Sequence, residues 1–424
     1  MRLVHSYSPF EEVCVLFDDG HKPAEISVWR ENDLKTGALH VAQAVRSVST
    51  GWFLDVGDGK SAYMNNPPFY LKPDGTICKT GLTQGDRLIV RIIRPETWEK
   101  EAEASYKVSL SGQTVVWTPT QSTPSFSRRL DQAAIDRLKL LAPNDGVLFR
   151  TAARDGDLNE ISAEIEKLKR LWQSLLSVKK DRAGVLFPPL KDIRQYAEKY
   201  RKQLTEIVTD DSQTAAILKQ DGFPVTFDVH GVWNKECLDE VLDAAVAEKT
   251  ALPCGGCLMT QQTAACVCFD VNSGAVRPAE ANEEACYEIL RQIRLKGLGG
   301  QMIIDFAGRK DEKIIRRLLP KLKDEKIFIS GISTLGLVEL TVEKTRRSLL
   351  DLFSDDQRAV RTAARLIRRL WFASGVSEVK ISASPAVLNG VRPYLGRLEE
   401  RLGAKIELRV SEILNLEGMQ DENT

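Results

Sequence analysis

Several features that would place this chain in a special class are absent from its sequence. No apolar run approaches the ~18 residues of a membrane-spanning helix, and the start, MRLVHSYSPFEEV, is polar where a signal peptide would be apolar. The formal net charge is zero, so any surface for nucleic acid would be a local patch. There is no low-complexity tract and no internal repeat. These absences predict a cytoplasmic globular protein with no membrane partner.

The cysteines are few and unevenly spaced, and four of the 8 fall in one short stretch. In a cytoplasmic chain this argues against a disulfide framework. The pair Cys254 and Cys257, followed by Cys266 and Cys268, is compatible with a zinc site. The same stretch also reads as strand, turn and strand, in which Cys266 and Cys268 alternate with apolar residues. We favour small packing residues over zinc ligands and expect no stoichiometric zinc.

What is present is the composition of a multidomain globular protein, with 424 residues, of which 43% are hydrophobic and 28% are charged. Residues 12–28 form two alternating runs around an Asp-Asp-Gly turn, which predicts a hairpin. Five short strand-like runs within 38–112 suit a small Greek-key barrel of the OB type. From about 128 to 205 the apolar spacing becomes helical, and Asp157 followed by Glu160 marks a helix start.

The second half of the chain alternates strands and helices. Within 251–340, a strand ends near Asp270, a helix spans about 283–296, and a continuously apolar strand ends at Asp305. The last segment, 355–424, reads as helix, strand, helix and strand. The predicted fold class is therefore α+β with several domains.

Asp270 and Asp305 are the strongest candidates for chemistry, because each lies at the carboxyl end of a strand, where open α/β sheets bind ligands. If the two strands are neighbours, a spacing of ~4.8 Å brings both carboxylates within reach of one cation. Asn272 would point to the same side and could orient a scissile phosphate. Such a site suits Mg²⁺, which activates water and stabilises charge on phosphorus. Strand-end aspartates also cap helices and turns, so the residues alone leave both interpretations open.

Longer stretches around these residues carry a distinctive pattern: LPCGGCLMTQQTAACVCFDVNSG, ANEEACYEILRQIRLKGLGGQMIIDF and FISGISTLGLVEL. Leu-Pro-x-Gly-Gly, a strand ending in Asp-Val-Asn-Ser, and Leu-Gly-Gly leading to Ile-Asp-Phe together resemble the catalytic core of the ribonuclease E/G family. EEVCVLFDDGHKPAEISV, SLSGQTVVWTP, SFSRRL and GVLFRTA match further parts of the family in the same order. The resemblance is patchy but colinear over most of the chain.

The resemblance implies specific roles for five residues. Asp270 and Asp305 would be metal ligands and Asn272 would support them, so these three would be the catalytic residues with Mg²⁺ as cofactor. Arg150 and Thr151 match the pair that the family uses to recognise a 5′-monophosphate end. Guanidinium and hydroxyl groups suit this role, since the first grips phosphate bidentately and the second donates a further bond. Without the resemblance, a solvent-exposed arginine at a strand end would be the ordinary interpretation.

In the predicted barrel, Phe53 and Tyr63 fall on positions where the family stacks single-stranded bases, and Lys100 lies nearby for phosphate. Phe53 is equally compatible with barrel core. Trp52 beside it must point the other way, so one of the two is exposed.

A basic stripe occurs near the C-terminus, where arginines step by three, four and three along one predicted helix: Arg358, Arg361, Arg365 and Arg368. A solvated helix face is the commoner meaning of such a run, and contact with an RNA backbone is the less common one.

The resemblance also implies an architecture of named regions. They are a split RNase H-like framework (1–36 with 190–248), an OB-type barrel (37–112), a helical 5′-end sensor region (113–189), a DNase I-like α/β catalytic region (249–353) and a small C-terminal α/β domain (354–424).

The chain departs from the family in several places. The segment after Asn272 lacks the family's Thr-Gly-rich loop. After Asp305 the family continues with a second acidic residue and Met, whereas here Phe306-Ala307-Gly308-Arg309 follows. Thr334 and Val342 replace two arginines that would contact substrate phosphate. The family's Cys-Pro-x-Cys zinc link is absent, so we expect a monomer or a homodimer that zinc does not hold together.

Together these patterns predict a magnesium-dependent endoribonuclease. It would hydrolyse single-stranded RNA (ribosomal RNA, a tRNA precursor or mRNA) and leave 5′-phosphate ends. The alternative is a non-catalytic RNA-binding protein that keeps the fold. The retained Asp-Asn-Asp set favours the enzyme, and the replaced arginines favour the alternative.

Overall fold

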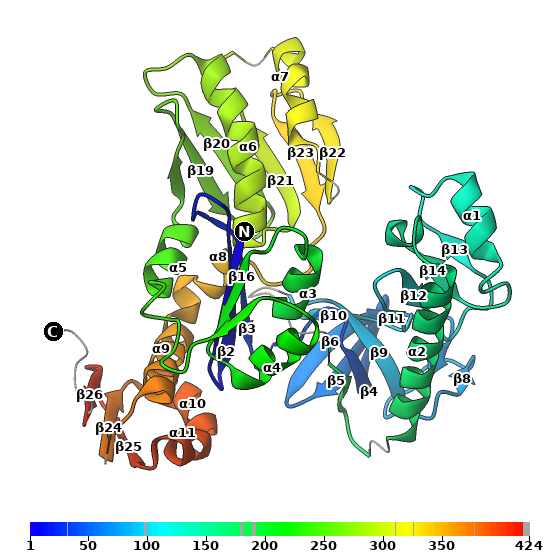
Figure 1. The fold of residues 1–424 in the computed structure, drawn as a ribbon, viewed down its shortest axis with the longest axis horizontal. Coiled ribbons are helices and arrows are strands. Elements are labelled where there is room, and N and C mark those ends of the chain that lie inside the picture. The colour runs from blue at the N-terminus through cyan, green and yellow to red at the C-terminus, as the bar shows by residue number, and fades with distance from the viewer. Residues whose placement is uncertain are drawn as a thin grey trace. The chain divides into compact units, whose positions relative to one another are not determined.

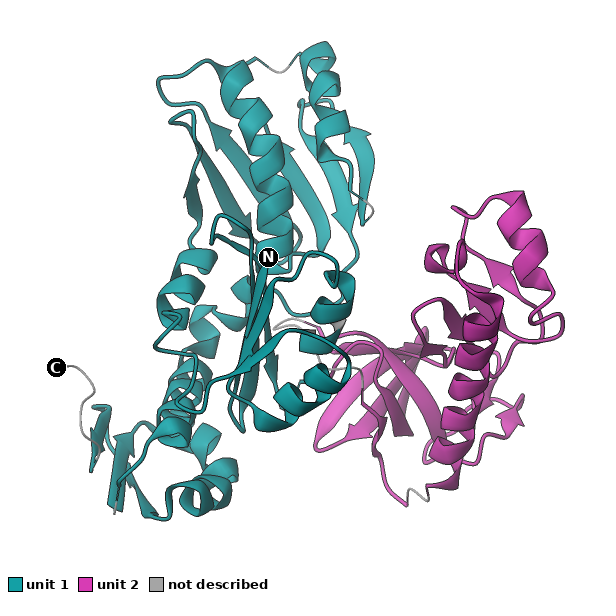
Figure 2. Ribbon diagram, viewed as in Figure 1, with its two compact units in different colours: residues 1–33, 190–424 teal, residues 34–189 magenta. Residues whose placement is uncertain are grey.

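The computed structural model describes residues 1–31, 33–96, 100–178, 181–188, 192–309, 311–324, 326–376 and 378–418. The chain divides into two units, one of residues 1–33 with 190–424 and one of residues 34–189 (Figure 2). Each unit combines sheets with helices, which confirms the α+β class. Within the described ranges, no helix has both the length and the apolarity to cross a bilayer.

The unit of residues 34–189 contains a closed five-stranded barrel, as the spacing of short strands predicted. Its strands run in the order β4, β5, β6, β10 and β9, and β4 also pairs with β9, which closes the sheet on itself. The bounds are β4 (Leu39–Val48), β5 (Gly51–Gly57), β6 (Lys60–Asn65), β9 (Arg87–Arg94) and β10 (Ala102–Ser105). Three short strands extend the sheet, namely β7 (Tyr70–Leu71), β8 (Ile77–Cys78) and β15 (Gly184–Phe187).

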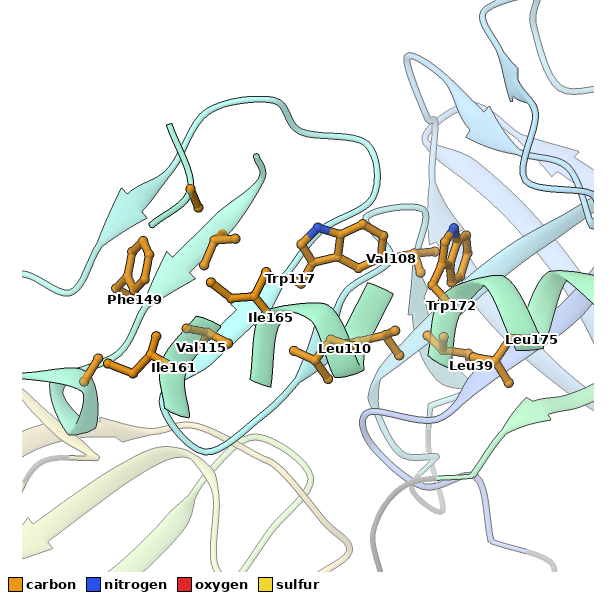
Figure 3. Packing of buried hydrophobic residues seen from close by; sticks show 14 of the residues in the cluster. Leu39, Val108, Leu110, Val115, Trp117, Phe149, Ile161, Ile165, Trp172 and Leu175 are labelled. Carbon is orange, nitrogen blue, oxygen red and sulfur yellow. The ribbon is translucent and has the colours of Figure 1, made fainter. Parts of the chain in front are cut away.

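A four-stranded sheet and a long helix form the rest of this unit. The sheet comprises β11 (Leu110–Ser111), β12 (Val115–Trp117), β14 (Val147–Phe149) and β13 (Ser125–Phe126), with α1 (Gln132–Lys139), η1 (Thr151–Ala153) and α2 (Leu158–Ser177). The predicted start of α2 is confirmed, because the Asp157 carboxylate accepts a bond of 2.6 Å from the amide of Asn159. The apolar stripe of α2 packs on the sheet (Figure 3): Ile161, Ile165, Leu168, Trp172 and Leu175.

In the other unit, the first strands and a segment about two hundred residues later build one sheet. Its order is β17 (Val225–Phe227), β16 (Glu206–Thr209), β1 (Arg2–Tyr7), β2 (Glu11–Phe17) and β3 (Pro23–Arg30). The helices of this region are α3 (Asp192–Lys199), α4 (Ser212–Gln220) and α5 (Leu238–Val246). The predicted N-terminal hairpin is confirmed as the antiparallel pair β2 and β3.

A six-stranded sheet follows in the same unit. Its order is β18 (Lys249–Ala251), β19 (Cys257–Gln262), β20 (Val267–Asn272), β21 (Gly300–Asp305), β23 (Val338–Val342) and β22 (Ile327–Ile332). Helix α6 (Pro278–Lys296) connects β20 to β21 and lies along the sheet (Figure 1), with α7 (Glu312–Leu318) and η2 (Leu319–Leu322) beyond it. Helix α6 begins earlier than predicted, with Pro278 in its first turn, and ends at Gly297 as predicted, where φ is 62°.

The C-terminal part contains a small three-stranded sheet with helices. Its elements are α8 (Leu349–Leu352), η3 (Asp355–Gln357), α9 (Arg358–Phe372), β24 (Glu378–Ala383), α10 (Pro385–Val391), η4 (Arg392–Tyr394), α11 (Leu395–Leu402), β25 (Lys405–Val410) and β26 (Asn415–Glu417). The alternation of helix and strand predicted for this segment is confirmed.

The arginine stripe on α9 has only in part the meaning that the sequence favoured. Arg368 is 7% exposed, donates to the Glu11 carboxylate, and stacks with its guanidinium carbon 3.1 Å from the ring centroid of Trp233. Arg365 lies 3.3 Å from the Asp239 carboxylate and stays exposed. The interpretation as a solvated face is therefore wrong for Arg368, which joins α9 to the N-terminal strands. Its partners come from distant segments, which periodicity alone does not reveal.

Candidate active site

The two candidate metal ligands lie side by side. Strands β20 and β21 are parallel neighbours, and their register places Asp270 directly opposite Asp305. Because adjacent strands are ~4.8 Å apart, both carboxylates are within reach of one cation. Asp270 is exposed and Asp305 is half-buried. The geometric condition that the sequence left open, that the two strands be neighbours, is met.

Alternation along β20 places the polar residues on the face opposite α6. Phe269 and Val271 are buried in the core under the helix, whereas Asp270 and Asn272 are exposed on the other face. The side-chain oxygen of Asn272 accepts a bond of 2.8 Å from the amide of Gly274. This bond directs the oxygen to the turn and leaves the NH₂ group to donate to a ligand.

The donors suit a hard cation with open coordination positions. Among the residues that the structure describes, no three His, Cys, Asp or Glu side chains gather as a metal-binding group. Glu339 lies on the same face of the sheet as the two aspartates. Its cross-strand partner on β21 is Ile303, two residues before Asp305. Two carboxylates that leave the remaining positions to water and substrate oxygens are a common arrangement for Mg²⁺.

Helix α6 holds the loop that follows Asp305. The Asn282 side chain, 4% exposed, donates to the carbonyl of Ala307 at 3.0 Å and accepts from the amide of Ala307 at 2.8 Å. This paired contact fixes the path of the chain as it leaves the carboxylate. Sequence reasoning missed Asn282; the available signal was a polar residue between Ala281 and Ala285 on the apolar side of α6.

Arg150 and Thr151 are adjacent to a second group of polar contacts, in the unit of residues 34–189. Arg150 follows β14, is exposed, and donates through Nη1 to the carbonyl of Gly112 at 3.0 Å. The hydroxyl oxygens of Thr151 and Ser127 are 2.9 Å apart. The structure thus brings two hydroxyls together, of which sequence reasoning missed Ser127, while the neighbouring Arg150 guanidinium contacts the Gly112 carbonyl.

A carboxylate from α2 holds the turn that Arg150 contacts. Glu164 accepts from the amide of Thr114 at 3.0 Å, and also from the amide of Gln113 and the hydroxyl of Thr114. The turn of residues 112–114 is therefore bound both by Glu164, at Gln113 and Thr114, and by Arg150, at Gly112. Sequence reasoning missed Glu164, because an acidic residue on the polar side of a helix carries no signal of a distant backbone partner.

In the barrel, Trp52 and Phe53 point to opposite sides, as predicted, but both are half-buried and neither is fully exposed. Trp52 packs against the barrel core, whereas Phe53 points outward and lies opposite Tyr63 on β6. The two rings are in edge contact, with centroids 5.7 Å apart, and the Arg46 guanidinium lies 4.6 Å from the centroid of Phe53. Lys100 is exposed just before β10, which pairs with β6. Phe53 is thus not barrel core.

A hollow of about 540 Å³ opens beside Phe53. Its polar lining includes both signs of charge: Asp55, Asp58, Asp181, Lys60 and Arg182. The aromatic pair, rather than this mixed hollow, is the feature suited to a nucleic-acid strand.

The sequence profile of the ribonuclease E/G family matches residues 109–345, which is more than half of the chain. The chain belongs to the ribonuclease E/G family. It is 26% identical to ribonuclease G of Salmonella typhimurium over 438 aligned residues, which cover 86% of this chain and 87% of the relative. The same values hold for ribonuclease G of Escherichia coli. Ribonuclease E of Synechocystis sp. is 26% identical over 342 residues, covering 71% of this chain and 51% of the relative. This membership identifies the chain as an endoribonuclease.

The two replaced family arginines have different structural settings. Thr334 is exposed at the tip between β22 and β23, so an arginine there would reach solvent or substrate. Val342 is 4% exposed and packs in the core beneath α6. Position 342 in this chain therefore faces away from the carboxylates, and its substitution removes no cation from their face.

The cysteines of this ribonuclease E/G member have different settings. Cys254 packs against the core as a partly buried residue. Cys266 and Cys268 are half-buried, and their sulfur atoms are 3.7 Å apart, on the face opposite the core residues Val267 and Phe269. Burial, together with the neighbouring Cys266 thiol, raises the pKa of Cys268. The predicted alternation along the strand is confirmed.

Proposed function

We propose that this chain is a magnesium-dependent endoribonuclease that hydrolyses single-stranded RNA and leaves 5′-phosphate ends, in RNA processing or decay. The observation that carries the proposal is the in-register pair Asp270 and Asp305 on the face of the sheet away from α6. The family's ribonuclease G and ribonuclease E relatives support the same reaction class.

Within this proposal, Asp270 and Asp305 hold Mg²⁺ and Asn272 orients the scissile phosphate through its free NH₂ group. The cation would supply a Lewis acid that stabilises negative charge at phosphorus and lowers the pKa of a bound water. The open coordination positions leave room for a phosphate oxygen and that water.

Arg150 and Thr151 form the proposed site for a 5′-monophosphate, with Ser127 as an additional donor. The terminal phosphate carries more charge than an internal phosphodiester, so a guanidinium and two hydroxyls favour it over a 5′-hydroxyl end. Phe53 and Tyr63 would stack bases of the strand, and Lys100 would contact its backbone; stacking contributes about 1–3 kcal/mol per base.

The regions then take the roles that the resemblance implies. We propose an RNase H-like framework, an OB-type RNA-binding barrel, a sensor region, a DNase I-like catalytic region and a small C-terminal domain in a cytoplasmic protein. Its partners would be ribosomal RNA, tRNA precursors or mRNA. Assembly, if it occurs, would not depend on zinc.

The direct test is cleavage of a short 5′-monophosphorylated, A/U-rich single strand with MgCl₂, comparing wild type with Asp305→Asn and with Glu339→Gln as a control on the same face. We expect wild type and the control to cleave the strand and to leave 5′-phosphate product ends. We expect no cleavage by Asp305→Asn. Binding without cleavage by wild type would instead support the non-catalytic RNA-binding alternative.

A further inference from the structure

Two exposed arginines lie at the edge of the sheet where the two candidate metal ligands are placed. Arg277 comes five residues after Asn272, directly before α6, and Arg309 comes four residues after Asp305. Both segments therefore leave the sheet at the carboxyl ends of β20 and β21, where the two aspartates lie.

The segments that carry these arginines are in contact. Asn282 holds the backbone of Ala307 through two hydrogen bonds of 2.8 and 3.0 Å. A Cβ atom added to Gly308 would stand only 2.9 Å from Cβ of Pro278. Arg277 and Arg309 each adjoin one of these touching residues, so the two arginines start from neighbouring points of the backbone.

Some neighbouring cations are paired closely with acids, as in Arg291–Glu288 (2.7 Å) and Lys321–Glu283 (2.9 Å). The Arg277 side chain is 89% exposed. Its ion pair with Glu280 is loose, because the nitrogen and the carboxylate oxygen are 3.9 Å apart, beyond hydrogen-bond distance. No ion pair joins Arg309 to another of the residues that the structure describes. The two charges are available to an external anion.

We propose that Arg277 and Arg309 form a binding site for the phosphodiester backbone of the RNA strand, next to the two aspartates. This inference rests on the proposed function, because it names the contact that would hold the substrate there. The two cations offset the two carboxylates, so a polyanion can approach the edge.

The test is equilibrium binding of a fluorescently labelled 5′-hydroxyl RNA 10-mer at several salt concentrations. The protein carries Asp270→Asn throughout, so that no cleavage occurs and the result does not depend on catalysis. Each loss of one phosphate contact lowers the slope of log K against log salt by about 0.7 for a single strand. We expect Arg277→Ala and Arg309→Ala each to show this decrease and to weaken binding about fivefold, with a roughly additive double variant.

Matched variants separate this site from general charge effects. Arg316→Ala on α7, whose guanidinium is paired with Glu312, should leave the slope and affinity unchanged. Arg277→Lys and Arg309→Lys should keep the slope, because a point charge suffices to neutralise a phosphate. An unchanged slope in the double Ala variant, or an equal decrease in Arg316→Ala, would overturn the proposal. Absence of cleavage by the otherwise wild-type protein would instead refute the proposed function.

Discussion

Replacing Asp270 by Asn should change stability in opposite directions with and without magnesium. The register of β20 and β21 places two like charges directly opposite each other. Such cross-strand pairs cost roughly 0.2–1 kcal/mol. Asn has nearly the same volume and no charge, so the metal-free variant should be more stable than wild type by about 0.5 kcal/mol.

Magnesium should reverse this order. A ligand that binds only the folded state at ten times its Kd stabilises that state by about 1.4 kcal/mol. Wild type should gain this amount, whereas the variant, with one carboxylate, should gain little. In magnesium the variant should therefore be less stable than wild type by about 1 kcal/mol.

The assay is urea unfolding of both proteins in EDTA and in MgCl₂, with cleavage measured on the same preparations. Glu339→Gln is the matched control, since Glu339 shares the face but pairs with Ile303 rather than with an aspartate. It should respond to magnesium as wild type does. Equal stabilisation of wild type and Asp270→Asn by magnesium, together with equal cleavage, would refute the metal-site assignment.

Three further predictions concern other parts of the chain. Arg150→Ala should remove the preference for 5′-monophosphate over 5′-hydroxyl RNA in kcat/KM while cleavage continues; a wild type without this preference would contradict the sensor assignment. Burial lowers the pKa of Lys296 to about 8, below its value in the unfolded chain. Above pH 8 the unfolded state therefore binds more protons than the folded state, so the free energy of unfolding should rise with pH. Urea titrations at pH 7 and 10 should show that Lys296→Met flattens this rise. Arg368→Met removes the closer of two arginines that face the buried Glu11 carboxylate, and leaves Arg30 at 4.0 Å. It should lower the free energy of unfolding by about 3 kcal/mol, and adding Glu11→Gln should recover part of this loss; a loss below about 1 kcal/mol would contradict this pairing.

Local patterns in the sequence were sufficient to predict the elements that carry the site. The apolar runs before Asp270 and Asp305 are strands, and Asp157 starts a helix, as predicted. These predictions succeed because strand alternation, helix periodicity and capping depend on residues within a few positions of one another. The family resemblance added roles that these local patterns do not contain, such as those of Arg150 and Thr151.

Tertiary structure decided which distant residues meet. The in-register contact of Asp270 with Asp305 follows from the order of strands in the sheet, and the pairing of Arg368 with Glu11 joins positions 357 residues apart. The buried orientation of Val342 likewise depends on which side of the sheet α6 covers. A sequence determines the period and the polarity of each element by itself. The partner of a buried charge and the face that remains open depend on how all the elements pack, because burial is a property of the assembled layers.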